Sequence, residues 1–126
     1  MKTVLAIAVG GSLGALARYY FSIGAAKIFG TAFPWGTLLE NFIGCFVMGI
    51  LAALMDKFWM PSAEIKAFLT IGFLGAFTTF SAFSLDFALL HERGELLVGG
   101  LYVLASVIAS IGGIFLGMLL IRLISQ

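Results

Sequence analysis

Charged residues are scarce in this sequence, and their scarcity excludes most classes of soluble protein. Lysine and arginine together number 7, aspartate and glutamate number 6, and only 10% of the 126 residues are charged. A soluble domain is usually about 25% charged. This chain therefore cannot coat a water-facing surface, which excludes a soluble globular enzyme and a disordered tail. The formal net charge of +1 also lacks the basic footprint of a nucleic-acid-binding protein, so we expect no nucleic-acid partner.

Residues that carry catalytic or metal-binding chemistry are equally few. The single cysteine, Cys45, allows no intrachain disulfide and no cysteine-rich metal site. The single histidine, His91, falls in a predicted loop and is expected to be solvated. The sequence contains neither a glycine-rich phosphate-binding loop nor a Ser-His-Asp set. We therefore predict that the protein is not an enzyme.

Long hydrophobic segments dominate what is present. Hydrophobic residues make up 62% of the chain, and a helix that spans a bilayer needs about 20 mainly apolar residues. Four segments meet this requirement, at about residues 3–26, 33–55, 67–90 and 96–122. The sequence therefore predicts an all-α integral membrane protein, with a single four-helix transmembrane domain over residues 1–126 that contacts membrane lipid.

The topology in the membrane is weakly encoded. The basic residues near the ends of the spans are Lys2, Lys57, Lys66 and Arg122 on one side and Lys27 and Arg93 on the other. This division is a poor bias under the positive-inside rule. Two interpretations stay open: insertion with the N-terminus in the cytoplasm, and insertion in both orientations.

Polar residues inside the spans are the candidates for function, because polar groups in lipid must find partners or line water. In the second span, Thr37 and Asn41 share one helix face. The Asn41 amide can donate two hydrogen bonds, which suits an anion; a hydrogen bond between helices is the alternative. Glu40 and Arg18 are charges within spans. Three interpretations of Arg18 stay open: it caps a helix end, it pairs with Glu40 or Asp86, or it attracts an anion at a pore mouth.

The fourth span carries a line of hydroxyl groups. Tyr102, Ser106 and Ser110 are four residues apart and therefore lie along one helix face. Such a line can pass a small anion from one donor to the next. The alternative is that each serine bonds to the backbone of its own helix.

The third span has an unusual centre. Gly72 and Gly75 precede Thr78 and Thr79 there, and both residue types are poor helix formers. A local break would free backbone carbonyls, which are good ligands for a hard cation when they are buried in protein. A continuous helix with glycine packing points is the alternative. Phenylalanines recur along the same span at spacings of three and four, and the positive edge of an aromatic ring can face a small anion.

Three stretches of sequence carry a resemblance to a known family. They are Gly10-Gly11-Ser12-Leu13-Gly14-Ala15-Leu16-Ala17-Arg18-Tyr19; Gly36-Thr37-Leu38 with Asn41, Gly44, Phe46 and Gly49; and Gly72-Phe73-Leu74-Gly75-Ala76-Phe77-Thr78-Thr79-Phe80-Ser81 with Phe83. Together they resemble the Fluc (CrcB) fluoride channel family. The resemblance covers nearly the whole chain, and the third stretch is its most specific part.

The resemblance implies a passive channel in the bacterial inner membrane that exports fluoride from the cytoplasm and relieves fluoride toxicity. It implies an antiparallel, dual-topology homodimer with two pores. It also implies a structural Na⁺ at the centre of the dimer, held by the backbone carbonyls of Gly75 and Thr78. The fluoride pathway that it implies contains Asn41, Phe80, Phe83, Ser81, Tyr102, Ser106 and Ser110.

Three positions depart from the pattern of that family. Glu40 stands where an apolar residue is usual, Ala82 replaces a threonine, and Asp86 replaces a glutamate. An ionised Glu40 would repel fluoride unless it pairs with a cation or becomes neutral. Two other functions are therefore weighed: a small proton-coupled exporter, similar to the small multidrug resistance family, that uses Glu40, and a membrane subunit that transports nothing.

Overall fold

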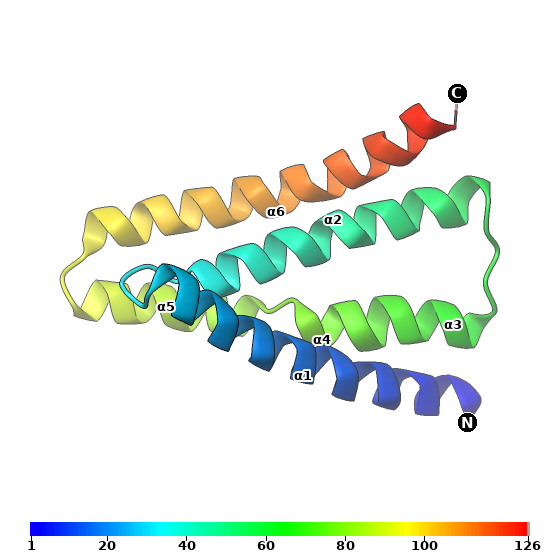
Figure 1. Ribbon diagram of the computed structural model, residues 1–126, viewed down its shortest axis with the longest axis horizontal. Coiled ribbons are helices and arrows are strands. Elements are labelled where there is room, and N and C mark those ends of the chain that lie inside the picture. Colours follow the sequence, from blue (N-terminus) through cyan, green and yellow to red (C-terminus); the bar gives the residue numbers. More distant parts are fainter. Residues whose placement is uncertain (126) are drawn as a thin grey trace.

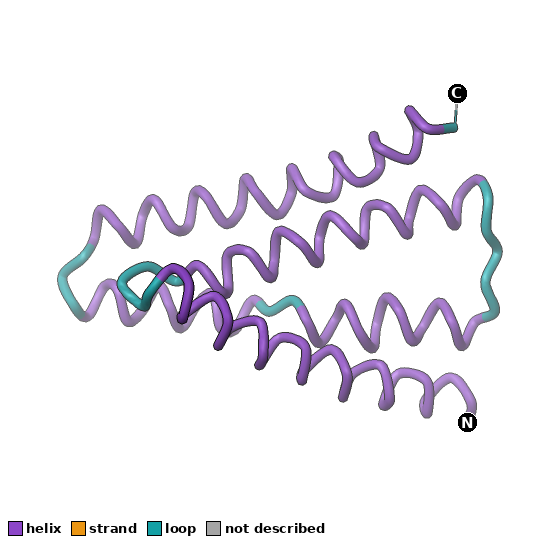
Figure 2. Tube along the Cα trace, viewed as in Figure 1, coloured by secondary structure: helices purple, strands orange, loops and turns teal. Residues whose placement is uncertain are grey.

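The computed structural model describes residues 1–125, which form helices joined by short loops (Figures 1 and 2). Four segments are long and apolar enough to cross a membrane, which confirms the prediction of four spanning helices. Three of them are single helices: α1 (Lys2–Phe29), α2 (Trp35–Lys57) and α6 (Leu96–Ile124). The third span, Ala63–Glu92, consists of α3 (Ala63–Ala67), the π-helix η1 (Phe68–Leu74), α4 (Gly75–Phe77) and α5 (Phe80–Glu92).

The four spans run alternately in opposite directions, so both termini lie at the end of the bundle that holds the loop between α2 and α3 (Figure 1). α2 packs along α6, and α1 packs along η1 and α4. The third span begins earlier than the hydrophobic pattern predicts, because Ser62 caps it. The Ser62 hydroxyl accepts a hydrogen bond from the Ile65 N–H at 3.3 Å, which satisfies a free donor of the first turn.

Glycines allow these helix pairs to approach closely. An added Cβ at Gly14 on α1 would clash with the backbone of Phe73, and one at Gly117 on α6 would clash with the carbonyl of Phe46. Such contacts are typical of membrane helices, which associate through close packing because lipid removes the hydrophobic drive between them. The backbones of each pair are therefore in direct contact, and the helix positions around the polar residues are fixed.

The interior of the bundle is small and partly polar. The largest side chains that are fully buried are Tyr102, Leu90 and Glu40, and Leu38 completes the small apolar cluster with Leu90 and Tyr102. Many large apolar side chains on every span are exposed. An apolar exterior is what lipid contact requires, so the burial pattern agrees with a multi-pass membrane protein.

The third span is interrupted near its middle rather than continuous. Thr78 and Thr79 have extended backbones, with φ −80° and ψ 153° at Thr78 and φ −153° and ψ 123° at Thr79. The break appears as a short loop between two helical halves in Figure 2. Irregular backbone at membrane depth must be buried in protein or line a cavity. The break is therefore the place where a site is expected.

Candidate functional site

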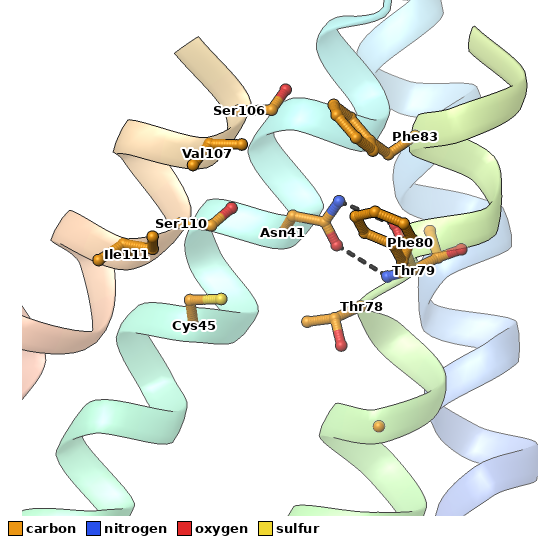
Figure 3. Close-up of a pocket in the computed structure, with 11 residues that line it drawn as sticks. Asn41, Cys45, Thr78, Thr79, Phe80, Phe83, Ser106, Val107, Ser110 and Ile111 are labelled. Atoms are coloured by element: carbon orange, nitrogen blue, oxygen red, sulfur yellow. Dashed lines mark hydrogen bonds between the residues drawn. The ribbon is translucent and has the colours of Figure 1, made fainter. Parts of the chain in front are cut away.

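The amide of Asn41 on α2 holds the break in the third span. Its Nδ2 donates to the Thr79 carbonyl at 3.0 Å, and its Oδ1 accepts from the Thr79 N–H at 2.7 Å (Figure 3). An amide has the donor and the acceptor that one residue of extended backbone needs. Asn41 thus forms the hydrogen bond between helices that the sequence left as one interpretation. Nδ2 carries a second hydrogen, which is available to a ligand in the cavity that Asn41 lines.

Thr79 starts the second half of the span. Its hydroxyl accepts from the Ala82 N–H at 3.1 Å and so caps α5. The same hydroxyl lies 3.2 Å from the hydroxyl of Ser81, and either oxygen can be the donor. The residues that break the helix therefore also assemble a pair of neighbouring hydroxyl groups.

A cavity of about 490 Å³ lies beside the break, between α2, α5 and α6 (Figure 3). We call it the phenylalanine cavity. Its lining comprises Asn41, Cys45, Gly75, Thr78, Thr79, Phe80, Phe83, Ser106, Val107, Ser110 and Ile111. None of these residues is charged, so the polar groups that face the cavity are amide, hydroxyl, thiol and backbone groups.

Two phenylalanines form one wall of this cavity. The ring centroids of Phe80 and Phe83 are 5.3 Å apart with an interplanar angle of 43°. Phe83 packs in turn on Tyr102, with centroids 5.4 Å apart. Phe80 is 78% exposed, so in the single chain the cavity is open on the side of Phe80.

Two serines of α6 form part of the opposite wall of the phenylalanine cavity (Figure 3). Ser110 is half-buried, whereas Ser106 is buried and its hydroxyl oxygen has no hydrogen-bond partner among residues 1–125. A buried hydroxyl without a partner is costly, and each such group calls for an explanation. A ligand in the cavity would supply the missing partner.

Tyr102 continues the line of Ser106 and Ser110 along α6. It is fully buried but does not line the phenylalanine cavity. Its hydroxyl donates to the Asp86 carboxylate at 3.0 Å, and its ring packs between Phe33 and Phe83. Asp86 also lines a small cavity of about 60 Å³ together with Arg93. The Tyr102 hydroxyl is thus committed to a carboxylate in the single chain.

A second cavity, of about 500 Å³, lies between α1, α2 and α5, and we call it the arginine cavity. It is lined by Ala15, Arg18, Tyr19, Ser22, Thr37, Glu40, Thr79, Ser81, Ala82 and Leu85. Thr79 lines both cavities. Glu40 lines this charged cavity, whereas its neighbour on α2, Asn41, lines the uncharged one.

Glu40 is the most deeply buried charged residue, with 1% of its surface exposed. Ser22 on α1 donates a hydrogen bond to its Oε1. Within the described part of the chain, no basic nitrogen lies within 4.0 Å of a carboxylate oxygen. Arg18 therefore shares the arginine cavity with Glu40 but forms no direct ion pair with Glu40 or Asp86.

The structure gathers the residues singled out in the sequence into two groups. The phenylalanine cavity brings together Asn41, Gly75, Thr78, Phe80, Phe83, Ser106 and Ser110. The arginine cavity brings together Arg18, Glu40 and Ser81.

The roles of Thr79 and Ser22 were not predicted from the sequence. The capping position of Thr79, three residues before Ala82, is a recognisable signal. The contact between Ser22 and Glu40 joins two spans and has no local signal.

Four apolar spans, a broken third helix and a partly polar cavity beside the break define a small multi-pass membrane protein. Comparison with known proteins shows to which family it belongs. The chain matches the family described as CrcB-like protein, Camphor Resistance (CrcB), over residues 5–118. It belongs to this family, which the relatives below identify as the CrcB/FluC fluoride channel family.

Similar proteins cover almost the same length. The chain is 52% identical over 122 residues to the "Fluoride-specific ion channel FluC" of Rhodospirillum centenum, with 97% of each chain covered. It is 48% identical to the protein of that name from a strain of Rhizobium etli, covering 97% of this chain and 98% of the relative. For the protein of that name from Agrobacterium fabrum the identity is 42%. The resemblance drawn from the sequence is confirmed, and the family is one of ion channels and not of enzymes.

Proposed function

We propose that this protein is a passive, fluoride-selective ion channel that exports fluoride across the bacterial inner membrane and so relieves fluoride toxicity. The observation that carries the proposal is the phenylalanine cavity, in which the Asn41 amide, two serine hydroxyls and two aromatic rings surround an uncharged space beside the helix break. The family membership and the names of the relatives agree with it.

The lining of the phenylalanine cavity suits a small anion that must bind and leave again. The second N–H of Asn41, the unpartnered hydroxyl of Ser106 and the hydroxyl of Ser110 can replace water around fluoride. The ring edges of Phe80 and Phe83 add positive electrostatic potential without a formal charge. Because no charged residue is part of this lining, the cavity favours the weak binding that conduction requires.

The assembly that we propose is an antiparallel homodimer with two pores. Phe80 is 78% exposed, and Val107 and Ile111 on the facing helix are exposed too. A second copy packed on this side would close the phenylalanine cavity. The four-to-two division of basic residues allows the chain to insert in both orientations, which an antiparallel dimer requires.

The dual orientation can be tested by labelling. In a Cys45→Ser background, Glu92→Cys at the exposed end of α5 supplies one thiol outside the bundle. We expect an impermeant thiol reagent to label about half of the protein from each side of sealed vesicles. Labelling from one side only would contradict the antiparallel dimer.

The break also fits the structural Na⁺ that the family resemblance implies. In a continuous helix the N–H of Thr79 would donate to the carbonyl of Gly75, and the N–H of Ala82 to that of Thr78. Here these donors bind Asn41 Oδ1 and Thr79 Oγ1 instead. The two carbonyls are therefore free of their helical partners, and hard cations prefer such oxygen ligands. Gly75 and Thr78 of each subunit would hold the ion, which has a structural role.

A proton-coupled exporter is the competing function, and the burial of Glu40 is the observation that favours it. An exporter of this kind would lose all transport in Glu40→Gln and would move fluoride only with a proton gradient. Conduction driven by voltage alone, and retained in Glu40→Gln, distinguishes the channel from this exporter.

The decisive experiment is fluoride efflux from proteoliposomes under a potassium gradient with valinomycin, followed by a fluoride electrode. We expect fast, voltage-driven release of fluoride. Chloride-loaded vesicles are the selectivity control, and we expect no chloride release. Absence of fluoride release from correctly folded protein would contradict the proposed function.

A further inference from the structure

We propose that Glu40 is a proton-binding site that controls fluoride conduction, so that the channel conducts faster when Glu40 is protonated. The inference rests on the proposed function and concerns the arginine cavity, which shares the lining residue Thr79 with the phenylalanine cavity. It starts from the position of Glu40. This carboxyl group is 1% exposed, lies within a spanning helix and directly precedes Asn41.

A carboxyl group in this position is costly unless it serves a function. A charge inside a membrane span normally pairs with an opposite charge, but within residues 1–125 Glu40 forms no ion pair. Its hydrogen-bond partner is the neutral hydroxyl of Ser22. A serine hydroxyl can donate to a carboxylate and can accept from a carboxylic acid. Ser22 therefore accommodates both protonation states of Glu40.

The charges that face Glu40 come from two other spans. Arg18 on α1 and Asp86 on α5 both act on its carboxyl group. The other titratable groups nearby are Tyr19, which lines the same cavity, and Tyr102, which donates to Asp86. Arg18 is thus the cation of the arginine cavity, and the charge state of Glu40 decides whether the cavity is electrically neutral or positive.

The two charge states have opposite consequences for an anion. With Glu40 ionised, its negative charge offsets that of Arg18 and repels fluoride from Thr79 and Ser81. When a proton binds the carboxylate, the Arg18 charge is uncompensated and attracts an anion. Thr79 lines both cavities, and its hydroxyl lies 3.2 Å from that of Ser81. An anion held beside Thr79 in the arginine cavity would therefore lie against a residue that also lines the phenylalanine cavity.

The test is the pH dependence of voltage-driven fluoride efflux, with the same pH on both sides of the vesicles and with the leak of protein-free vesicles subtracted at each pH. For the unaltered protein we expect efflux to rise as pH falls, by roughly tenfold, as one proton binds; this change corresponds to about 1.4 kcal/mol. Glu40→Gln should stay at the fast level at every pH. Glu92→Gln, at the exposed end of α5, is the matched control and should keep the pH profile.

A second variant keeps the inference testable if Glu40→Gln does not fold. Ser22→Ala removes the hydrogen-bond partner of the Glu40 carboxyl group, so the midpoint of the pH profile should shift. An infrared band of a protonated carboxyl group should follow the same midpoint and should be absent in Glu40→Gln.

The outcomes separate this inference from the function on which it rests. Fluoride efflux that does not depend on pH, or the same pH dependence in Glu40→Gln, would overturn the role of Glu40 and leave the channel intact. Loss of efflux in folded Glu40→Gln would also overturn it. Absence of fluoride efflux from the unaltered protein at every pH would overturn the proposed function itself.

Discussion

The two cavities beside the helix break differ in charge, although they share Thr79. The phenylalanine cavity is lined by neutral groups alone, whereas the arginine cavity contains Arg18 and Glu40. Charge acts over a longer range than a hydrogen bond and collects ions from solution, but a fixed charge at the point of passage would hold an ion too tightly for rapid release. In the proposed channel, attraction and passage of the ion would therefore be carried by separate regions of the molecule.

The largest effect is expected from a change that introduces charge into the neutral cavity. In Asn41→Asp, a carboxylate oxygen replaces Nδ2, faces the Thr79 carbonyl and removes a donor for the anion. Hydrogen bonds to charged groups are worth about 1.5–3 kcal/mol. We therefore expect fluoride efflux to fall roughly ten- to a hundredfold. Efflux at the unaltered rate, from protein with unchanged size-exclusion behaviour, would remove Asn41 from the pathway.

The aromatic wall should have the next largest effect. Phe80→Ile keeps an apolar side chain and loses the positive ring edge that can face an anion, so we expect efflux to fall by about tenfold. The matched control is Phe115→Ile on the exposed surface of α6, which lines neither cavity and should conduct normally. Equal rates in the two variants would show that the Phe80 ring does not contact the ion.

Removing the cation of the arginine cavity should have a smaller effect, which depends on salt. In Arg18→Gln we expect efflux to fall a few-fold at low ionic strength and to approach the unaltered rate at high ionic strength, because salt screens the attraction. Arg122→Gln, near the C-terminal end of α6, provides the control. A loss that is the same at all ionic strengths would instead assign a structural role to Arg18.

The smallest effect on transport is expected at Ser106. Its buried hydroxyl has no hydrogen-bond partner among residues 1–125, so Ser106→Ala should raise the free energy of unfolding by about 1 kcal/mol. Efflux should fall by no more than about twofold, because Asn41 and Ser110 also face the cavity. A thermal melt in detergent and the efflux assay measure the two quantities. A destabilised variant would show that another group already satisfies the hydroxyl.

The sequence predicts the four spans well because hydrophobic length is a local property. The position of the break is also local, since Gly75, Thr78 and Thr79 are poor helix formers that follow one another closely. The division of the polar residues between two cavities is not local. It depends on the Asn41–Thr79 contact, which joins residues far apart in the sequence, and on the close packing that Gly14 and Gly117 permit.

Individual residues show the same limit. Tyr102 continues the line of Ser106 and Ser110 by spacing, yet its hydroxyl bonds to Asp86 and its ring is enclosed between Phe33 and Phe83. Periodicity places a residue on a helix face, but the neighbouring helices decide what that face contacts. The partner of Glu40 was equally hidden, because Ser22 on another span carries no distinguishing pattern.

The neighbouring hydroxyl groups of Thr79 and Ser81 bear on whether an ion would pass equally well in both directions. Either oxygen can donate to the other across 3.2 Å, so rotation of two O–H bonds reverses the dipole of the pair. An anion that arrives from either cavity meets a hydrogen that can turn toward it. In the proposed channel, the pair would therefore act as a reversible relay that imposes no direction of travel, and the electrochemical gradient alone would determine which way the ion moves.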